Sequence, residues 1–503
     1  MRFPEFFKSL TGFFPFPYQE RLADQLLQGK PVILRVPTGA GKTWAMVAPF
    51  LYSMATGRRL ADRLLYALPR RSLASSLFAT TQQQMRGVLE RVVTTGKDRD
   101  YTSAATFCSL QIGGQKDDPF FESDLVFTTI DQLLSSYILL PVSLPNRLGN
   151  MNAGSLPGSL VVFDEIHLLD PSVALGTAIE MLHRLKGLCQ FVLMTATMSD
   201  EAIAWLAEKL GAFVLPISDD EVRALPSQQN KRRAWAWNPE PISAIAIRPH
   251  HYGGRTIVLA NSVKRAQNLF LDLADIFKNE TNPPKLILLH SRFYPEHRKD
   301  IEKELPKYFG PKGTCTNVIL VTTQVIEAGI DISADHLHTE LTPMNALIQR
   351  AGRTARYESR NTGMVTVYEL NGLGPYVEEK TLIDDTRRVL QELSTASENI
   401  NFTQEQRWVE KVHKGVEGAR LRRYANLISQ RSAVHEAMDQ GHRGKLSQLV
   451  RDIDSILRTP RTKTRKLVNR SADAQQSFLF ERGRDPPFQS RLGLGCSLRP
   501  LSA

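Results

Sequence analysis

Short apolar runs alternate with helix-compatible stretches along the first part of the chain. The runs up to about residue 225 are PVILRVP, RLLYALP, DLVFTTI, LVVFDEI and FVLMTAT. They are rich in β-branched and aromatic residues, which favour strands. Strands that alternate with helices are typical of parallel α/β sheets. The pattern therefore predicts an α/β domain over residues 1–225.

A second group of such runs predicts another parallel α/β domain over residues 241–370. Its members are RTIVLAN, KLILLHS, NVILVTT and GMVTVYEL. The segment between the two groups, SDDEVRALPSQQNKRRAWAWNPEP, carries many charges and prolines. Such a composition is typical of a connection, and we place a linker at residues 226–240.

The chain changes character after Leu370. Charged, helix-favouring stretches such as YVEEKTLIDDTRRVLQEL predict a helical accessory region over residues 371–458. From Arg458 onward there are ten Lys or Arg and three Asp or Glu, a difference of +7. This stretch holds Gly, Pro and Ser without periodicity, so we expect a basic disordered tail over residues 459–503.

Composition narrows the class of protein. The chain has 503 residues, 42% of them hydrophobic, and a formal charge of +11. A basic excess suits a polyanion such as nucleic acid, although a basic protein without such a partner has the same charge. Its four cysteines form no C-x-x-C pair, which argues against a zinc or iron–sulfur site and fits a reducing cytosol. No apolar run is long enough to span a bilayer, so we expect a soluble cytoplasmic protein.

The segment PVILRVPTGAGKTWAMV predicts a phosphate site, because a strand, a glycine-rich loop and a helix follow one another. Loop N–H groups and the helix N-terminus would surround the phosphates of ATP. Lys42 would reach the β- and γ-phosphates, and the Thr43 hydroxyl would hold Mg²⁺. The general pattern has its first glycine at the position of Val36, whereas here the glycine lies inside the loop. The candidate ATP-binding residues are Pro37, Thr38, Gly39, Ala40, Gly41, Lys42 and Thr43.

The strand-like run LVVFDEIHLLD ends in two acids. Hydrolysis of ATP needs one carboxylate near the metal and another group to position or deprotonate the water. We assign the metal role to Asp164 and the water role to Glu165. His167 would couple this site to Thr195 and Thr197 of the run FVLMTAT, although it could also be a packed histidine.

The segment ALIQRAGRTAR predicts a contribution from the second domain. Gln349, Arg353 and Arg356 are spaced i, i+4 and i+7, so we expect them on one face of a helix. The two arginines could neutralise charge that develops on the γ-phosphate. A solvated basic helix is the simpler alternative. In the preceding run VTTQVIEAGIDIS, Gly329 and Asp331 follow a strand and could touch the nucleotide or transmit domain closure.

The motifs together resemble those of the superfamily 2 helicases. FPFPYQ, with Gln19, resembles the adenine-reading Q motif; ALPRRSLA, FDEIH, TAT, IVLANSVKRAQ, LVTTQVIEAGID and QRAGRTAR resemble motifs Ia, II, III, IV, V and VI in order. The resemblance covers about residues 16–356. It implies two RecA-like domains in tandem, with ATP and Mg²⁺ in the cleft and single-stranded nucleic acid across both domains.

Within this superfamily the chain looks most like the signature helicase of type I CRISPR interference. The particular segments are FTTIDQLL, ANSVKRAQ, LLHSRF and HTELTPMNALIQRAGR. Many members carry an HD nuclease, but none of the eleven histidines here precedes an aspartate. The resemblance therefore implies a helicase recruited by an RNA-guided surveillance complex, with a separate HD nuclease subunit. Ala355 replaces a glycine common in motif VI, which we expect to cost little because alanine favours helices.

The resemblance implies an ATP-driven helicase or translocase on single-stranded DNA. Its backbone contacts would be largely independent of sequence. A superfamily 2 RNA helicase and an ATP-gated DNA clamp that does not unwind remain alternatives. The candidate nucleic-acid contacts are Arg70, Arg71, Gly113, Gly114, Thr128, Thr129, Arg292 and Thr322.

Overall fold

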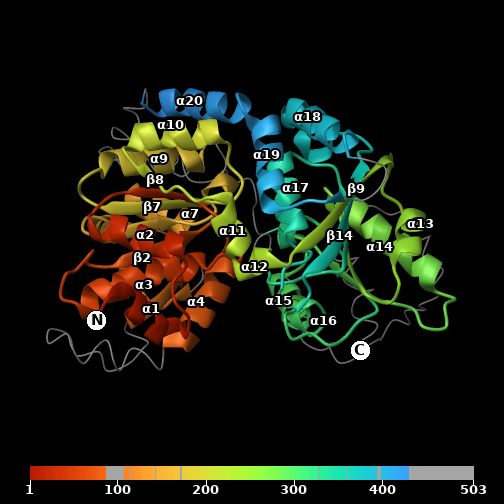
Figure 1. Cartoon of the computed structure of the whole chain (residues 1–503), viewed down its shortest axis with the longest axis horizontal. Helices are drawn as coiled ribbons and strands as arrows, with labels where there is room; N and C mark the ends of the chain where they lie inside the picture. Colours follow the sequence, from red (N-terminus) through yellow and green to blue (C-terminus); the bar gives the residue numbers. More distant parts are fainter. Residues whose placement is uncertain are drawn as a thin grey trace, which may run out of the picture.

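Two α/β domains lie side by side and are joined by a linker and by a helical arm (Figure 1). This computed structural model describes residues 1–85, 107–113, 115–141, 143–169, 173–327, 329–357, 359–393 and 398–429. The predicted fold, two parallel-sheet domains followed by helices, is confirmed.

The first domain is built on an eight-stranded sheet in the order β4-β3-β5-β2-β6-β7-β1-β8. All pairings are parallel except that of β3 with β4. The strands are β1 (Val32–Arg35), β2 (Leu64–Leu68), β3 (Cys108–Ile112), β4 (Gln115–Lys116), β5 (Leu125–Thr129), β6 (Leu160–Phe163), β7 (Gln190–Thr195) and β8 (Phe213–Val214). Because β1 and β6 both pair with β7, the phosphate loop and the two acids leave the sheet at the same edge.

Both faces of this sheet are buried, which explains its continuous apolar runs. In β6, Val162 packs into the core on one face, whereas Val161 and Phe163 pack into the core on the other. The first face is covered by α1 (Phe3–Thr11), α2 (Pro17–Leu27), α3 (Lys42–Ala55) and α4 (Arg71–Met85). The second is covered by α7 (Ile130–Tyr137), α9 (Ala174–Arg184) and α10 (Asp200–Leu210), with α8 (Gly149–Gly154) beside α7.

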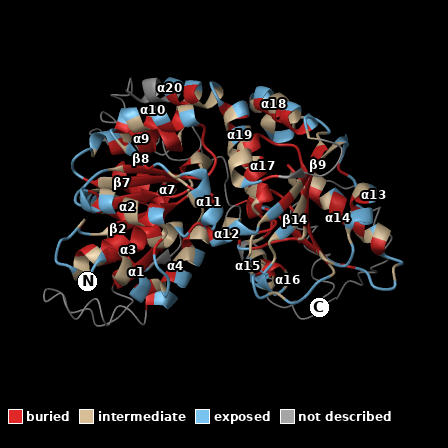
Figure 2. Ribbon diagram, viewed as in Figure 1, coloured by how far each residue is buried: buried red, intermediate tan, exposed pale blue. Residues whose placement is uncertain are grey.

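The second domain has a seven-stranded sheet in the order β11-β12-β10-β13-β14-β9-β15, parallel except for β15. Its strands are β9 (Arg232–Pro241), β10 (Arg255–Leu259), β11 (Lys285–Leu289), β12 (Val318–Thr322), β13 (His336–Glu340), β14 (Thr362–Glu369) and β15 (Glu398–Asn399). Its helices are α13 (Ala244–Ile247), α14 (Val263–Phe277), α15 (Pro295–Glu304), α16 (Pro306–Phe309), α17 (Met344–Ala351) and α18 (Lys380–Gln391). Figure 2 shows the strands of both sheets as mostly buried.

The predicted linker at residues 226–240 is wrong for most of its length. Residues 232–241 form β9, which pairs with β14 inside the second sheet. The alternation in RRAWAW places Arg233 and Trp235 on a buried face, and their charge and size hid this strand pattern. The connection consists instead of α11 (Asp219–Ala224) and α12 (Pro226–Gln229). Arg21 of α2 holds it to the first domain through an ion pair with Glu221 at 2.7 Å.

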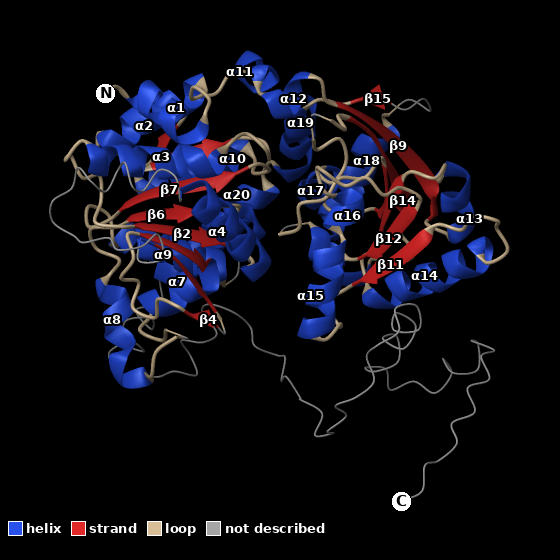
Figure 3. Ribbon diagram, turned by 90° about the horizontal axis from the view of Figure 1, so that it is seen from below, coloured by secondary structure: helices blue, strands red, loops and turns tan. Residues whose placement is uncertain are grey.

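A helical arm after the second sheet returns to the first domain. Its two helices are α19 (Phe402–His413) and α20 (Val416–Ser429). The first packs against α17 and α18, and the second against α9 and α10 (Figures 1 and 3). The backbone N–H of Ser199 donates to Glu417 at 2.8 Å, and that of Gly415 donates to Glu201 at 2.7 Å. Residues 430–458 and the predicted tail at 459–503 lie outside the described residues.

A buried ion pair fixes the beginning of this arm to β9. The guanidinium of Arg233 donates to Glu405 of α19 and also to the carbonyl of Thr354, at 3.2 Å. Both charged side chains are almost completely buried.

Among the helices of the described ranges, none combines the length and the apolar character needed to cross a membrane.

We predict that Glu405→Gln destabilises the protein by about 3 kcal/mol, because it leaves the buried Arg233 cation without its counter-charge. Chemical denaturation would measure the change. The control is Glu392→Gln, which breaks an exposed pair with Lys411 and should cost less than about 1 kcal/mol. Equal effects of the two substitutions would contradict the structural role of the buried pair.

Candidate active site

The phosphate loop is shaped by two glycines and held by two side chains of α2. Gly39 and Gly41 have φ of 80° and 82°, in the left-handed region that favours glycine. Tyr18 donates a hydrogen bond to the carbonyl of Ala40 at 2.5 Å. The Gln19 amide donates to the carbonyl of Gly41 at 3.1 Å. A side chain at position 41 would collide with that amide, because its Cβ would lie 2.9 Å from Gln19 Nε2.

Lys42 contacts both of the acids that directly follow β6, and its side chain is largely buried. Its ammonium forms an ion pair with Glu165 and lies 3.4 Å from Asp164 Oδ1. Tyr66 of β2 donates to Asp164 Oδ2 at 3.0 Å. Burial acts to lower the pKa of Lys42, but the two carboxylates together outweigh it, so the pKa is raised. The ammonium therefore stays charged in the absence of a nucleotide.

The backbone at Glu165 is strained. Its φ of 52° places a non-glycine residue in the left-handed region directly after β6. Strain of this kind persists where the surroundings fix it, and it is common at functional sites. The conformation turns Glu165 back toward Lys42 while the chain continues into the short helix Ile166–Leu168.

His167 contacts both Thr195 of the first domain, as predicted from the sequence, and α17 of the second domain, which was not predicted. Its Nδ1 lies 2.8 Å from Thr195 Oγ1, and its Nε2 is hydrogen-bonded to the Gln349 amide of α17. The same amide reaches Thr197 Oγ1 at 3.5 Å. Burial, and then repulsion by Lys42, lower the pKa of His167 to about 3. The ring is thus neutral: Nε2 accepts from Gln349, and Nδ1–H donates to Thr195.

The expectation that Gln349, Arg353 and Arg356 share a helix face is wrong. Helix α17 ends at Ala351, and the chain turns at Gly352. Ala355 has φ of 48°, in the left-handed region, so the view that alanine costs little there as a helix former is also wrong. The three side chains nevertheless line one cavity, because a turn rather than a helix brings the arginines to it.

Each of these arginines already has partners in the second domain. Arg353 donates to the carbonyls of Ile330 at 2.7 Å and Glu327 at 2.5 Å, and it is buried. Arg356 forms an ion pair with Asp331 at 2.7 Å. Asp331 also accepts from Tyr357 at 3.1 Å.

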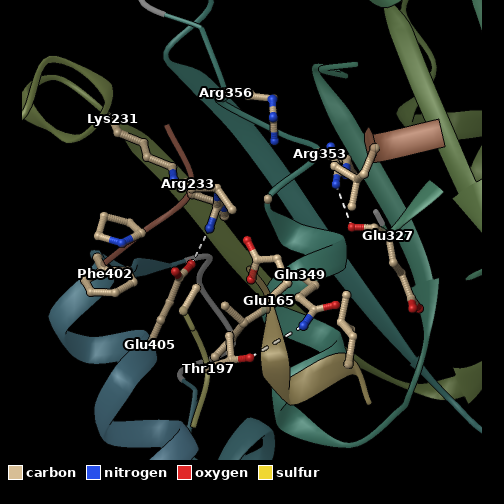
Figure 4. A pocket seen from close by; sticks show the side chains of 17 residues that line it. Glu165, Thr197, Lys231, Arg233, Glu327, Gln349, Arg353, Arg356, Phe402 and Glu405 are labelled. Carbon is tan, nitrogen blue, oxygen red and sulfur yellow. Dashed lines mark hydrogen bonds and ion pairs between the residues drawn. The ribbon is translucent and has the colours of Figure 1, made fainter. Parts of the chain in front are cut away.

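A cavity of about 100 Å³ separates the two domains (Figure 4). Residues from four parts of the chain line it. The first domain contributes Pro37, Thr38, Glu165 and Thr197; the linker contributes Lys231; the second domain contributes Arg233, Glu327, Gln349, Arg353 and Arg356; and the arm contributes Phe402 and Glu405. Gly329, whose φ is 95°, packs directly against Ser72 of α4 in the first domain. A side chain at position 329 would collide with Ser72, because its Cβ would lie too close to the Ser72 hydroxyl oxygen. Arg70 bridges the domains as well, donating to the carbonyl of Gln324 at 3.0 Å.

The candidate nucleic-acid contacts of the first domain lie apart from this cavity. Arg71 is exposed, and its guanidinium lies against Gly113. Thr128 and Thr129 are buried at the end of β5. The Thr128 hydroxyl donates to the carbonyl of Gln111 at 2.8 Å, and the Thr129 hydroxyl caps α7. Gly114 lies outside the described residues.

The corresponding residues of the second domain differ in exposure. Arg292 follows β11 and is exposed. Thr322 ends β12 and is fully buried, with its hydroxyl donating to the carbonyl of Leu289 at 2.8 Å. The three threonines therefore shape the strand ends, whereas Arg71 and Arg292 present charge to solvent.

Several site residues were missed from the sequence. Tyr18 and Tyr66 bond to the loop and to Asp164, and Glu405 neutralises Arg233 inside the cleft. Lys231 lines the cavity although it lies in the presumed linker. The tyrosines could have been suspected, because each neighbours a motif; nothing in the local sequence around Glu405 indicates its long-range partner.

Two family models match the regions that build this site. Residues 16–204 match the DEAD/DEAH box helicase model, and residues 252–359 match the model of the CRISPR-associated nuclease/helicase Cas3, C-terminal. The CRISPR-associated helicase Cas3 of Thermoproteus tenax is 27% identical over 396 residues, which cover 76% of this chain and 63% of that protein.

Solved structures show the same fold. T. fusca Cas3-AMPPNP has a TM-score of 0.65 at 20% identity, covering 86% of this chain and 56% of that one. A chain of a CRISPR RNA-guided surveillance complex, pre-nicking, has a TM-score of 0.58 at 21% identity, covering 84% and 54%.

The two parallel α/β domains, the ordered motifs and the two helicase-model matches are together those of the superfamily 2 helicases, and the chain is similar to that class. Within the class it is similar to CRISPR-associated helicases named Cas3 over three quarters of its length. These matches support the predicted nucleic-acid-dependent ATPase and the binding of ATP. The chain spans 63% of the Thermoproteus relative and about half of the matched structures.

We predict that Ala355→Gly leaves stability unchanged or raises it by up to about 1 kcal/mol, because it relieves the left-handed backbone. Ala346→Gly, within α17, is the control and should cost about 1 kcal/mol. Thermal unfolding would compare the two. A similar loss in both variants would indicate that position 355 is helical.

We predict that the His167 ring does not titrate between pH 5 and 8 in the folded protein. Its folded pKa of about 3 lies below the ordinary value of 6.5. Its contribution to stability is therefore complete above pH 6.5 and declines as the pH falls below that value. NMR of the imidazole protons would follow this, with the unfolded chain as reference. A midpoint near 6.5 in the folded protein would contradict the neutral bridge to Gln349.

Proposed function

We propose that the protein is an ATP-driven motor that acts on single-stranded DNA in type I CRISPR interference. The observation that carries the proposal is the cavity whose walls come from both domains. The phosphate loop and Glu165 line one side, and Gln349, Arg353 and Arg356 line the other. A site divided in this way is complete only when the domains are closed, so binding and hydrolysis of ATP would change their separation.

The first step of the mechanism is an exchange of partners at Lys42. Without nucleotide, its ammonium neutralises Glu165. The phosphates of ATP would attract Lys42 and release Glu165, which then faces the cavity as an acceptor for the proton of the attacking water. The base would thus become free only when the substrate is in place.

The residues around Asp164 fit a magnesium ion. Asp164 Oδ1 is buried and accepts no hydrogen bond from the described residues; its polar neighbour is the Lys42 ammonium, 3.4 Å away, which ATP would draw off. A carboxylate oxygen and the hydroxyl of Thr43 are hard oxygen donors, and Mg²⁺ commonly takes one or two such ligands together with substrate phosphates. When bound, the ion would supply neutralisation of phosphate charge.

Gln349, Arg353 and Arg356 would couple closure of the two domains to the bound ATP. The Gln349–His167 bond ties α17 to the segment that carries Glu165. Arg353 and Arg356 are held by carbonyls and by Asp331, and they would approach the γ-phosphate as the domains close. Gly329 would transmit the movement, because it packs directly on Ser72 of α4. Gln19 would read the adenine from beside the loop.

The nucleic-acid contacts proposed are largely to the phosphate backbone. Arg71 and Arg292 supply exposed charge from the two domains, and Arg70 lies where the domains meet. Thr128, Thr129 and Thr322 would position the ends of β5 and β12, which would lie beside the DNA. Contacts of this kind are independent of sequence and weaken with salt.

The CRISPR role rests on the relatives. Their names combine CRISPR with helicase or nuclease/helicase, and one matched structure is a surveillance complex. We propose that such an RNA-guided complex recruits this chain in the cytoplasm after opening the target duplex. Cutting would fall to a separate HD nuclease subunit, in keeping with the lack of any His-Asp pair in the sequence.

ATP hydrolysis measured without nucleic acid, with single-stranded DNA and with single-stranded RNA tests the proposal. We expect strong stimulation by DNA. Glu165→Gln should reduce the stimulated rate by about 10²- to 10⁴-fold while DNA binding is retained, because it removes the base. Glu392→Gln, on the surface of the second domain, is the matched control and should hydrolyse ATP normally.

The alternative outcomes point either to another function or to another catalytic base. Stimulation mainly by RNA would indicate a superfamily 2 RNA helicase. ATP-dependent DNA binding without strand displacement would indicate a clamp. Near-normal hydrolysis by Glu165→Gln would show that the base has been assigned to the wrong residue.

A further inference from the structure

Lys231 lies in the connection between the two domains, and its side chain lines the cavity between them. It follows α12 of the linker and precedes β9, and its backbone N–H donates to the carbonyl of Gln228 at 3.2 Å. Its side chain lines the cavity between the domains (Figure 4). It also lines a second, polar hollow beside Ser227 and Tyr357. The linker thus sends a cation into the candidate nucleotide site.

The acidic side chains near the Lys231 ammonium already form ion pairs with arginines. Glu405 pairs with Arg233, Asp331 with Arg356, and Glu327 with Arg350 at 2.8 Å. The described residues provide no hydrogen bond or ion pair to the Lys231 ammonium. Burial, and then repulsion by Arg233, lower the pKa of Lys231 to about 7. A partly desolvated cation beside other cations is unfavourable until an anion joins it.

The opposite wall of the cavity is the phosphate loop. Pro37 and Thr38 line the same space as Lys231. The linker even touches the loop: a Cβ at Gly39 would lie 3.1 Å from the Cβ of Ser227. An anion seated on the loop would therefore face Lys231 across a narrow gap.

We propose that Lys231 is a nucleotide-contacting residue, which binds a phosphate of ATP from the linker side. The inference rests on the proposed function, because it takes ATP as the substrate of this cavity. It assigns a role to a segment outside the helicase motifs.

The chain supplies a matched control in the next residue. Arg232 carries the same charge but is exposed, on the other face of β9. Binding of a fluorescent ATP analogue to the full chain would compare Lys231→Ala, Lys231→Arg, Arg232→Ala and Lys42→Ala. Loss of one charged hydrogen bond corresponds to about a tenfold or greater weakening of affinity. We therefore expect Lys231→Ala to bind about 10-fold more weakly, Arg232→Ala within about 2-fold of the wild type, and Lys231→Arg to recover most of the affinity.

Thermal unfolding separates a nucleotide contact from a structural role. Without ATP, Lys231→Ala should melt at or above the wild-type temperature, because it removes an unpaired cation. With ATP, its gain in melting temperature should be smaller than that of the wild type. A lower melting temperature without ATP, accompanied by weaker binding, would overturn the proposal.

The remaining outcomes are distinct. Unchanged ATP affinity in Lys231→Ala, together with lost affinity in Lys42→Ala, would overturn the role of Lys231 and leave the proposed function intact. Absence of ATP binding in the wild-type chain would instead overturn the proposed function on which the inference rests.

Discussion

A buried ammonium between two carboxylates is the constraint on which the active site depends. Lys42 cannot leave water without a counter-charge, since an unpaired buried ion costs several kcal/mol. Asp164 and Glu165 supply it only because β1 and β6 flank the same strand and end at one edge of the sheet. The order of the strands, the left-handed backbone at Glu165 and the hydrogen bond from Tyr66 all serve this arrangement. The resting protein is therefore held by an interaction that its substrate must displace.

The second domain reaches this charge cluster through neutral contacts. Gln349 bonds to a neutral His167, so the bridge between the domains does not add another ion to a crowded site. Of the nearby arginines, Arg356 is paired with Asp331, whereas Arg353 is held by backbone carbonyls, which accept its hydrogen bonds without neutralising its charge. Positive charge therefore remains on the wall opposite the phosphate loop, and the phosphates of the nucleotide would connect the two walls.

How far the sequence predicts this structure depends on the range of the interaction. The phosphate loop, the two acids and both sheets could be predicted, because each depends on local spacing and on apolar runs. The end of α17 could not, because the left-handed backbone at Ala355 is set by packing around the turn rather than by helix propensity. Strand β9 was hidden for a similar reason: the partner that makes a buried arginine acceptable is Glu405, 172 residues further along the chain.

The arm gives the chain a second crossing between the domains. The first crossing is the linker near Ser227 and Lys231, and the second lies between α19 and α20 at Gly415. Two connections between two domains define an axis that passes through both of them. Opening of the cleft would then be a rotation about that axis, with little freedom for the domains to slide or twist. The walls would separate and return along one path, so the arginines would meet the phosphate loop in the same register at every cycle.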